Sequence, residues 1–310
     1  MKKVITLVGP TASGKTSLAI ELAKRINGEI VSIDSRQIYK GMNIGTAQPS
    51  KKEMEIVKHH LVSCFNPTDF ISSGKYAVLV AKKINEIKKK DKTPILCGGS
   101  GLYYRTIQKG IFEGSKSNFN IRENLEKQYL KSPEILFKKL KKIDKKYAKI
   151  VHVNNKKRLI RAMEIYESTG KSPTEHFMKQ KLNPTKTIEL FTIFLNWERT
   201  TLNMRIKNRT SEMFKKGWIN EVENLLELQK KQNKKFLSLE SIGYKHIKYF
   251  LENKISKNEM LEKIYIKTRQ LARRQEKWFR KEPVDLYVMM DSLKDKNLYK
   301  ILGCFLGRIT

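Results

Sequence analysis

The N-terminal third of the chain alternates short apolar runs with stretches whose apolar residues recur at helical spacing. Apolar runs cover Lys3–Val8, Glu29–Asp34 and Thr93–Cys97, and the amphipathic stretch Ser17–Ala23 follows the first of them. This alternation predicts an α/β fold in which a parallel sheet is flanked by helices. Ligands of such sheets bind beyond the carboxyl ends of the strands. We therefore expect the segments that follow these runs to share one site.

The middle of the chain changes to a polar, lysine-rich pattern with helical periodicity, including Ile121–Lys131 and Lys157–Ser168. Strand character returns at Thr187–Leu195, which is expected to rejoin the sheet. The pattern therefore predicts an inserted all-helical domain, with residues 118–186 forming the insert and residues 1–117 and 187–310 forming the core.

The last third of the chain is mainly helical in its pattern. We expect helices over about Thr200–Lys216 and Trp218–Lys231, and a mostly helical segment over Ser241–Lys281. Asp285–Met290 is expected to form a last strand.

The chain of 310 residues is long enough for one large or two medium domains. No apolar run reaches the roughly 18 residues of a membrane span, and nothing near the N-terminus resembles a signal peptide. We therefore expect a cytoplasmic protein with no membrane partner. We also expect the chain to act as a monomer. Cys64, Cys97 and Cys304 lack the spacing of a metal site or a disulfide framework and are expected to be buried apolar side chains.

The charge of the chain is strongly positive. It carries 64 Lys and Arg against 31 Asp and Glu, a net charge of +33. Such an excess indicates a polyanionic partner, with nucleic acid the leading candidate, although lysines on solvated faces account for part of it. Arginine suits phosphate and base contacts better than lysine, and its clusters are Arg158 and Arg161, then Arg199, Arg205 and Arg209, then Arg269, Arg273, Arg274 and Arg280.

The segment after the first apolar run matches the phosphate-binding loop G-x-x-x-x-G-K-[ST]. Its residues are Gly9, Pro10, Thr11, Ala12, Ser13, Gly14, Lys15 and Thr16. The backbone N–H groups of such a loop and the positive end of the following helix face an anion. Lys15 adds a charge, and the hydroxyl of Thr16 is placed to hold Mg²⁺. The motif predicts that the chain binds a di- or triphosphate.

The ends of two further predicted strands indicate which chemistry the site could perform. Asp34 ends the second apolar run beside the phosphate loop, where a carboxylate could hold Mg²⁺ or accept a proton from a nucleophile. It could also cap backbone N–H groups, and the residues alone leave these roles open. The run Ile95–Cys97 ends in Gly98 rather than in the Asp that an NTP-hydrolysing site would place there. The loop could therefore hold a diphosphate as a leaving group, stabilised electrostatically as it departs.

The arginines Arg205 and Arg209 lie four residues apart and share one face of the expected helix. The same spacing would also suit two arginines on a solvated face.

Six segments taken together closely resemble the tRNA dimethylallyltransferases of the bacterial type, also called tRNA isopentenyltransferases. They are Gly9–Thr16, Asp34–Thr46, Gly98–Tyr103, Asn155–Ala162, Ile242–Tyr244 and Thr268–Gln275. Apart from the phosphate loop, each segment is weak alone. Their order and their spread over nearly the whole chain make the resemblance specific.

The resemblance implies a core like that of the P-loop NTPases and a defined reaction. A dimethylallyl group would pass from dimethylallyl diphosphate to N6 of the adenosine directly 3′ of the anticodon in tRNA, and diphosphate would be released. By similarity Asp34 is the base, Thr16 contacts the diphosphate and its Mg²⁺, and Arg209 with Arg205 binds the diphosphate. A carboxylate would help because an aryl amine is a poor nucleophile.

The resemblance also implies a set of tRNA contacts. These are Asp34, Ser35, Arg36, Gln37, Ser100, Arg122, Lys157, Arg158, Leu159, Ile160, Arg161, Gly243, Tyr244, Lys245, Arg269, Gln270, Arg273 and Arg274. Ser100 stands where the family usually has threonine, and keeps the hydroxyl. Asn43 replaces a frequent aspartate, with a consequence that we do not explain. Trp278 and Phe279 suit stacking on RNA bases or a place in the core, which we prefer.

Three other functions compete with this interpretation. An adenylate dimethylallyltransferase would use the same donor, but its small acceptor needs neither a helical insert nor arginine-rich helices. A small-molecule kinase with a phosphate loop would be expected to carry an acidic residue where Gly98 stands. In a nucleic-acid-binding protein whose loop only senses nucleotide, Asp34 would be idle.

Overall fold

The chain forms two units. The computed structural model describes residues 3–110, 117–182 and 188–292, so the expectations at Thr187 and Cys304 lie outside the described residues. One unit, the sheet unit, consists of residues 1–108 and 188–310, and the other, the helical unit, of residues 109–187.

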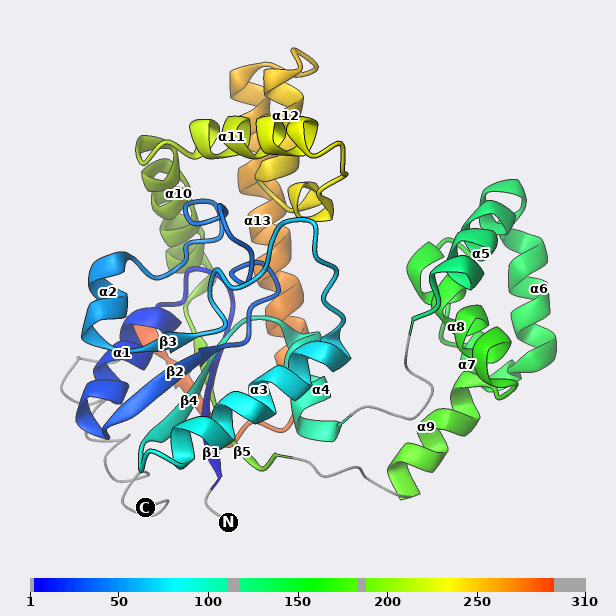
Figure 1. Cartoon of the computed structure of the whole chain (residues 1–310), viewed down its shortest axis with the longest axis horizontal. Helices are drawn as coiled ribbons and strands as arrows, with labels where there is room; N and C mark the ends of the chain where they lie inside the picture. The colour runs from blue at the N-terminus through cyan, green and yellow to red at the C-terminus, as the bar shows by residue number, and fades with distance from the viewer. Residues whose placement is uncertain (1–2, 111–116, 183–187, 293–310) are drawn as a thin grey trace. The chain divides into compact units, whose positions relative to one another are not determined.

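A parallel sheet forms the centre of the sheet unit, with six strands in the order β3-β2-β4-β1-β5-β6 (Figure 1). The strands are β1 (Val4–Val8), β2 (Gly28–Ser32), β3 (His59–His60), β4 (Thr93–Gly98), β5 (Leu190–Asn196) and β6 (Leu286–Met289). The predicted α/β class is confirmed. Because β1 lies between β4 and β5, the chain leaves it at the point where ligands bind in such sheets.

Helices lie on both faces of this sheet and beyond its carboxyl end. The helices of this unit are α1 (Lys15–Arg25), α2 (Lys51–Ile56), α3 (Ser73–Lys88), α4 (Gly101–Lys109), α10 (Arg199–Lys215), α11 (Trp218–Lys231), α12 (Tyr244–Leu251) and α13 (Lys257–Phe279), with the 3-10 turns η1 (Leu237–Glu240) and η2 (Met290–Ser292). Ile5 and Ile193 share a buried cluster with Leu18 of α1. On the opposite face, the hydroxyl of Tyr104 lies 2.9 Å from Oγ1 of Thr192. Helices α10 to α13 reach beyond the carboxyl ends of the strands (Figure 1).

The described residues of the helical unit form only helices and their connections. The helices are α5 (Phe119–Lys131), α6 (Pro133–Ile143), α7 (Lys145–Ala148), α8 (Lys156–Thr169) and α9 (Pro173–Leu182). Their core contains Leu125, Leu136, Leu140 and Leu159, which are all buried. Asn118 begins α5 because its side chain accepts hydrogen bonds from the N–H groups of Asn120 and Ile121.

The predicted elements are all present, with ends that shift by a few residues. The second strand ends at Ser32, so Asp34 stands on the loop beyond it. Strand β5 begins at Leu190, which pairs with Val4, the first residue of β1. Among the described residues, no helix is long and apolar enough to span a bilayer. The expectation for the cysteines is wrong at Cys64, which is exposed, whereas Cys97 is buried.

Candidate active site

The phosphate loop folds around the side chain of its own lysine. Gly14 has a φ of +89°, a value that favours glycine, and directly precedes Lys15, the first residue of α1. The ammonium of Lys15 donates to the carbonyl oxygens of Gly9 (3.1 Å) and Pro10 (2.7 Å) and to Oγ of Ser13 (3.3 Å). An added Cβ at Gly9 would lie 2.4 Å from the carbonyl oxygen of Leu195, so the loop lies directly against the end of β5.

Burial lowers the pKa of Lys15 to about 8. The positive charge of Arg209 acts in the same direction, whereas Cys97 and Asp34 act against it. The ammonium therefore lies in a site that lacks a fully compensating anion, which a diphosphate would supply.

We expect the affinity of the phosphate loop for a diphosphate monoester to fall as the pH rises above about 8, the pKa of Lys15. Below that pH Lys15 already carries its charge; above it, binding must also protonate the amine, because the bound anion raises the pKa. Titration calorimetry in two buffers of different ionisation enthalpy measures this proton uptake. The Lys15→Gln variant should bind weakly and show no such uptake, and equal uptake in both proteins would assign the effect to another group.

Helix α10 presents two arginines to the phosphate loop. The Nε of Arg205 donates to the carbonyl oxygen of Ala12 (2.9 Å), and its guanidinium lies 4.1 Å from the ring centroid of Trp197. One Nη atom of Arg209 donates to Oγ1 of Thr11 at 3.1 Å. The alternative of two arginines on a solvated face is therefore wrong. Burial lowers the pKa of Arg209, and the charge of Asp34 opposes this shift.

The carboxylate of Asp34 is held through one oxygen. Its Oδ1 accepts hydrogen bonds from the backbone N–H groups of Arg36 (2.8 Å) and Gln37 (3.3 Å). Its Oδ2 accepts none of the hydrogen bonds found among the described residues. Asp34 thus caps its own turn, as one sequence interpretation allowed, and retains an oxygen for a ligand or a proton.

One cavity of about 780 Å³ brings these groups together. It is lined by loop residues 11–17, by Asp34 and Gln37, by Arg205 and Arg209 of α10, and by Gly98 and Gly99. The loop and the carboxylate, separate in the sequence, therefore share one space, as predicted.

The glycines at the end of β4, Gly98 and Gly99, leave no room for side chains. A Cβ at Gly98 would lie 2.5 Å from the carbonyl oxygen of Ile33, and one at Gly99 would lie 2.4 Å from Nε2 of Gln275. The backbone of Ile33 and the side chain of Gln275 therefore leave no space for a carboxylate here.

Sequence reasoning missed Gln275 as a site residue. Its Oε1 accepts the N–H of Thr11 (2.8 Å), and its Nε2 donates to the carbonyl oxygen of Gly99 (3.0 Å). Gln275 thus joins the phosphate loop to the glycine loop. Its only sequence signal was its place at the end of the segment Thr268–Gln275.

Some residues expected at a tRNA surface of the sheet unit are partly accessible, and others are not. Ser35, Arg36, Gln37 and Ser100 are half-buried beside the cavity or near Asp34, and Lys245 is half-buried and paired with Glu240 at 3.3 Å. Gly243 and Tyr244 are buried. The expectation that the Tyr244 side chain contacts RNA is therefore corrected: its hydroxyl donates to Glu221 inside the unit.

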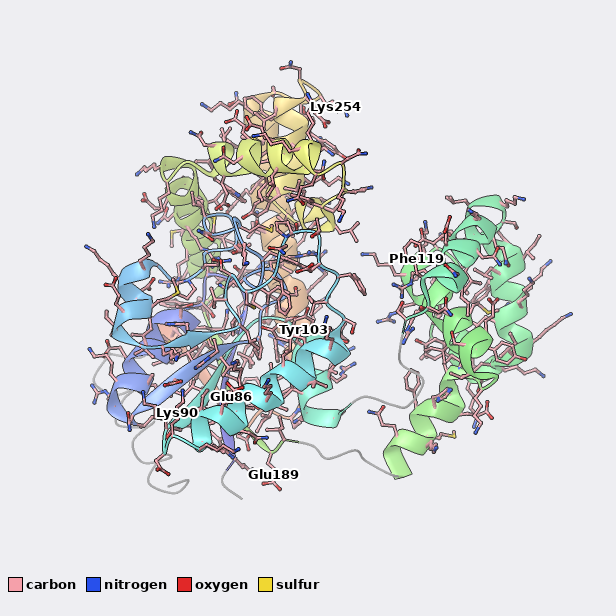
Figure 2. All side chains as sticks on the ribbon, in the orientation of Figure 1. Glu86, Lys90, Tyr103, Phe119, Glu189 and Lys254 are labelled. Carbon is pink, nitrogen blue, oxygen red and sulfur yellow. The ribbon has the colours of Figure 1, made fainter. Side chains whose placement is uncertain are left out.

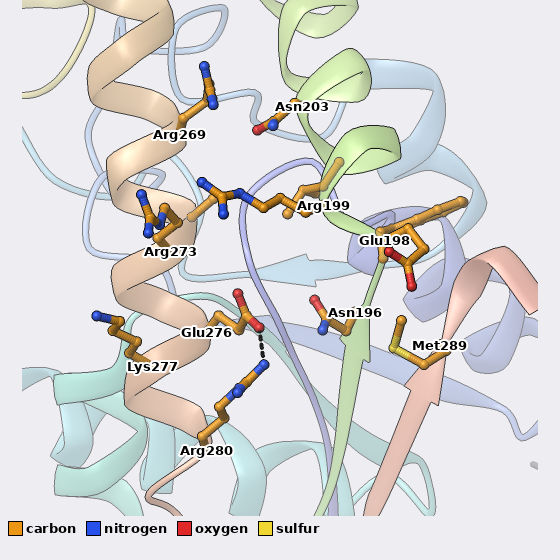
Figure 3. A pocket seen from close by; sticks show the side chains of 13 residues that line it. Asn196, Glu198, Arg199, Asn203, Arg269, Arg273, Glu276, Lys277, Arg280 and Met289 are labelled. Atoms are coloured by element: carbon orange, nitrogen blue, oxygen red, sulfur yellow. Dashed lines mark hydrogen bonds and ion pairs between the residues drawn. The ribbon is translucent and has the colours of Figure 1, made fainter.

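A second cavity, of about 490 Å³, lies between the start of α10 and α13. Figure 3 shows Arg199, Arg269 and Arg273 around it, with Asn196 at its floor and Arg280 bound to Glu276 at 2.6 Å. Among the described residues Arg199, Arg269 and Arg273 form no ion pair. Gln270 and Arg274, also expected at RNA, are exposed on α13.

The two aromatic residues that follow these arginines differ. Phe279 is buried and packs near Tyr104 and Phe194, which confirms the core interpretation. Trp278 is half-buried, and the guanidinium of Arg105 lies 4.2 Å from its ring centroid.

The arginine-containing segment Lys157–Arg161 of the helical unit has both buried and exposed residues. Leu159 and Ile160 are buried in the core, so the expectation that their side chains contact RNA is corrected. Arg122 and Arg161 donate to the same oxygen of the fully buried Glu164, at 2.9 and 2.8 Å. This pairing gives both a structural role, since a buried carboxylate needs partners. Lys157 and Arg158 are exposed.

The cavity offers few protein groups that could hold a metal ion. No group of three or more His, Cys, Asp or Glu side chains suits a metal ion among the described residues. Thr16 lines the main cavity. Mg²⁺ commonly keeps waters and binds through one or two protein oxygens and substrate phosphates, so the donors present fit an ion that arrives with a diphosphate.

Comparison with known proteins gives a consistent result. A family model described as IPP transferase matches residues 37–282. The tRNA dimethylallyltransferase of Acetivibrio thermocellus is 39% identical over 99% of this chain and 98% of its own length, and that of Petrotoga mobilis is 41% identical over 91% of each.

Solved structures agree with this. The tRNA isopentenylpyrophosphate transferase of Bacillus halodurans superposes with a TM-score of 0.72 at 34% identity, covering 100% of this chain and 97% of its own. A eukaryotic dimethylallyltransferase acting on tRNA gives a TM-score of 0.84 at 27% identity, covering 99% and 80%. The family model and these relatives show that this chain, in which the phosphate loop, Asp34 and the two arginines of α10 line one cavity, belongs to the IPP transferase family.

Proposed function

We propose that the protein transfers a dimethylallyl group from dimethylallyl diphosphate to N6 of the adenosine directly 3′ of the anticodon in tRNA, with release of diphosphate. The observation that carries the proposal is the shared cavity, in which a phosphate loop faces a carboxylate while β4 ends in glycine. The relatives' printed names supply the donor group and the acceptor.

The phosphate loop and α10 would bind the diphosphate. The loop from Gly9 to Thr16 offers backbone N–H groups and the ammonium of Lys15, and Arg205 and Arg209 offer positive charge beside it. Thr16 would hold Mg²⁺ together with diphosphate oxygens, and the ion would neutralise part of the charge of the leaving group. Negative charge builds up on the oxygen that joins the dimethylallyl group to the diphosphate as this bond breaks. The positive groups of the site bind that charge more strongly, which favours departure of the diphosphate.

Asp34 would accept the proton of the nucleophile. The bond between C1 of the dimethylallyl group and the diphosphate oxygen breaks, and its electron pair leaves with the diphosphate. The lone pair of N6 forms the new C–N bond, and a proton of N6 passes to Oδ2 of Asp34. The two N–H groups on Oδ1 hold the carboxylate in place for this transfer.

Basic surfaces of both units would bind the tRNA. In the sheet unit the cations around the second cavity have no carboxylate partners among the described residues except at Arg280. In the helical unit Lys157 and Arg158 are exposed. A small acceptor such as AMP would need neither surface. We place the protein in the cytoplasm because its proposed acceptor is tRNA. We propose that it acts as a monomer because the sheet unit of one chain holds the loop, Asp34 and Arg209.

A direct assay tests the proposal. The protein is incubated with labelled dimethylallyl diphosphate, Mg²⁺ and either unmodified tRNA or AMP. We expect label in tRNA, at the adenosine 3′ of the anticodon. Label in AMP alone would support the adenylate dimethylallyltransferase. A parallel incubation with labelled ATP in place of dimethylallyl diphosphate tests for a kinase, which would transfer phosphate to a small molecule.

Replacing Arg199, which the resemblance did not include, is expected to weaken tRNA binding. Loss of one phosphate contact should reduce the slope of log affinity against log salt by about 1. The Arg199→Gln variant is compared with Lys90→Gln, which removes the same charge at an exposed lysine after α3 (Figure 2). The slope is measured from binding of an anticodon stem-loop at several salt concentrations. Equal slopes in both variants would show that Arg199 makes no contact with an RNA phosphate.

A further inference from the structure

A single carboxylate of α11 joins two segments that are far apart in the sequence. Glu221 accepts hydrogen bonds from the backbone N–H groups of Ile44 (2.7 Å) and Gly45 (3.0 Å) and from the hydroxyl of Tyr244 (2.6 Å). Burial, and then the charge of Glu221, raise the pKa of Tyr244, so the hydroxyl keeps its proton and remains a donor. The carboxylate therefore links the loop after Asp34 to the first residue of α12.

The indole of Trp218 fills the space between the same two segments. A Cβ added at Gly45 would lie 1.9 Å from this ring, and one added at Gly243 would lie 2.0 Å from it. Gly243 also has a φ of +88°, which disfavours other residues. The segment Ile242–Tyr244, which the resemblance had linked to tRNA, thus packs against Trp218 and the loop.

The anchored loop in turn holds the residues around Asp34. The Nε2 of Gln37 donates to the carbonyl oxygens of Thr46 (3.3 Å) and Ala47 (2.9 Å). The backbone N–H of Gln37 donates to Oδ1 of Asp34 at 3.3 Å. A continuous path of hydrogen bonds and two short chain segments therefore runs from Tyr244 and Glu221 to the carboxylate of Asp34.

We propose that Glu221 is a positioning residue, which sets the place of Asp34 in the cavity by fixing the loop Asn43–Gln48. The proposal rests on the proposed role of Asp34 as the base. Glutamine at this position would keep one acceptor oxygen and turn an NH₂ group toward a backbone N–H, so the loop would lose one anchor and meet a repulsion. The phosphate loop has no part in this path and should keep its affinity for diphosphate.

The test compares Glu221→Gln with Glu223→Gln, which makes the same change at an exposed position of α11. We expect Glu221→Gln to lower the single-turnover rate of prenyl transfer by about ten- to a hundredfold, since small misplacements of a catalytic group have such effects. Binding of dimethylallyl diphosphate should be unchanged. Glu223→Gln should leave both unchanged, and equal rates in the two variants would overturn the proposal.

A double variant separates positioning from general damage. If Glu221 acts through Asp34, Glu221→Gln should cause no further loss in an Asp34→Asn background; losses that multiply would overturn the proposal. Hydrogen exchange of the amides of residues 36–48 gives a second readout, expected to speed up in Glu221→Gln only. Tyr244→Phe, which removes one donor and keeps the ring, should show a smaller change of the same kind if Glu221→Gln does not fold.

Failure of the proposed function is distinguishable from failure of this inference. If the unchanged protein does not label tRNA, the proposed function fails. If it does label tRNA but Glu221→Gln alters neither the rate nor the exchange of the loop, only the positioning role fails.

Discussion

Replacing Asp34 by asparagine is expected to lower the single-turnover rate of prenyl transfer by about 10²- to 10⁴-fold, the range of a lost general base. Asparagine keeps an oxygen for the N–H groups of Arg36 and Gln37 but cannot take the proton that Oδ2 would accept. Transfer of label to tRNA with enzyme in excess measures the rate. Binding of dimethylallyl diphosphate should remain unchanged.

The control is Asp91→Asn, the same substitution at an exposed residue before β4, which should leave the rate unaltered. The sequence left open whether Asp34 holds Mg²⁺ or accepts a proton, and this variant distinguishes the two. A loss of Mg²⁺-dependent diphosphate binding parallel to the loss of rate would assign Asp34 to the metal instead.

Arg209→Gln is expected to lower the same rate by about 10²- to 10³-fold, which is typical when a donor to developing negative charge is removed. The guanidinium is held by Thr11 of the phosphate loop at 3.1 Å and lines the cavity. Its interaction should strengthen as the diphosphate leaves, so the effect should persist at saturating donor.

Lys207→Gln removes the same charge from an exposed position of α10 and serves as the control. If Arg209→Gln only raises the donor concentration needed for half-maximal rate, Arg209 binds substrate and leaving group equally. That result would contradict a role specific to the departure of diphosphate.

Much of the sheet unit could be predicted because its signals are local. An apolar run followed by Gly9–Thr16 determines a strand, a loop and the start of a helix through residues next to one another in the chain. The place of Asp34 in the same cavity followed from a general property of parallel sheets, whose strand ends meet at one edge.

The roles of several side chains could not be predicted, because burial depends on what packs across from a residue. Leu159 and Ile160 lie in an arginine-rich segment, yet both point into the core of the helical unit. Gly243 and Tyr244 belong to a segment linked to tRNA by resemblance, but they contact Trp218 and Glu221. Periodicity reports a helix and its apolar face, and does not report which distant segment covers it.

By itself the sequence determined the α/β class, the helical insert, the phosphate loop and the family, since these depend on short-range patterns and on motif order. Tertiary structure alone decided that Gln275 joins two loops, that Arg122 and Arg161 share Glu164, and that Glu221 anchors the loop behind Asp34. Each of these contacts either joins residues that are far apart in the chain or gives a buried charge the partner that it needs. The free energy of such contacts depends on distances in space, which local patterns do not encode.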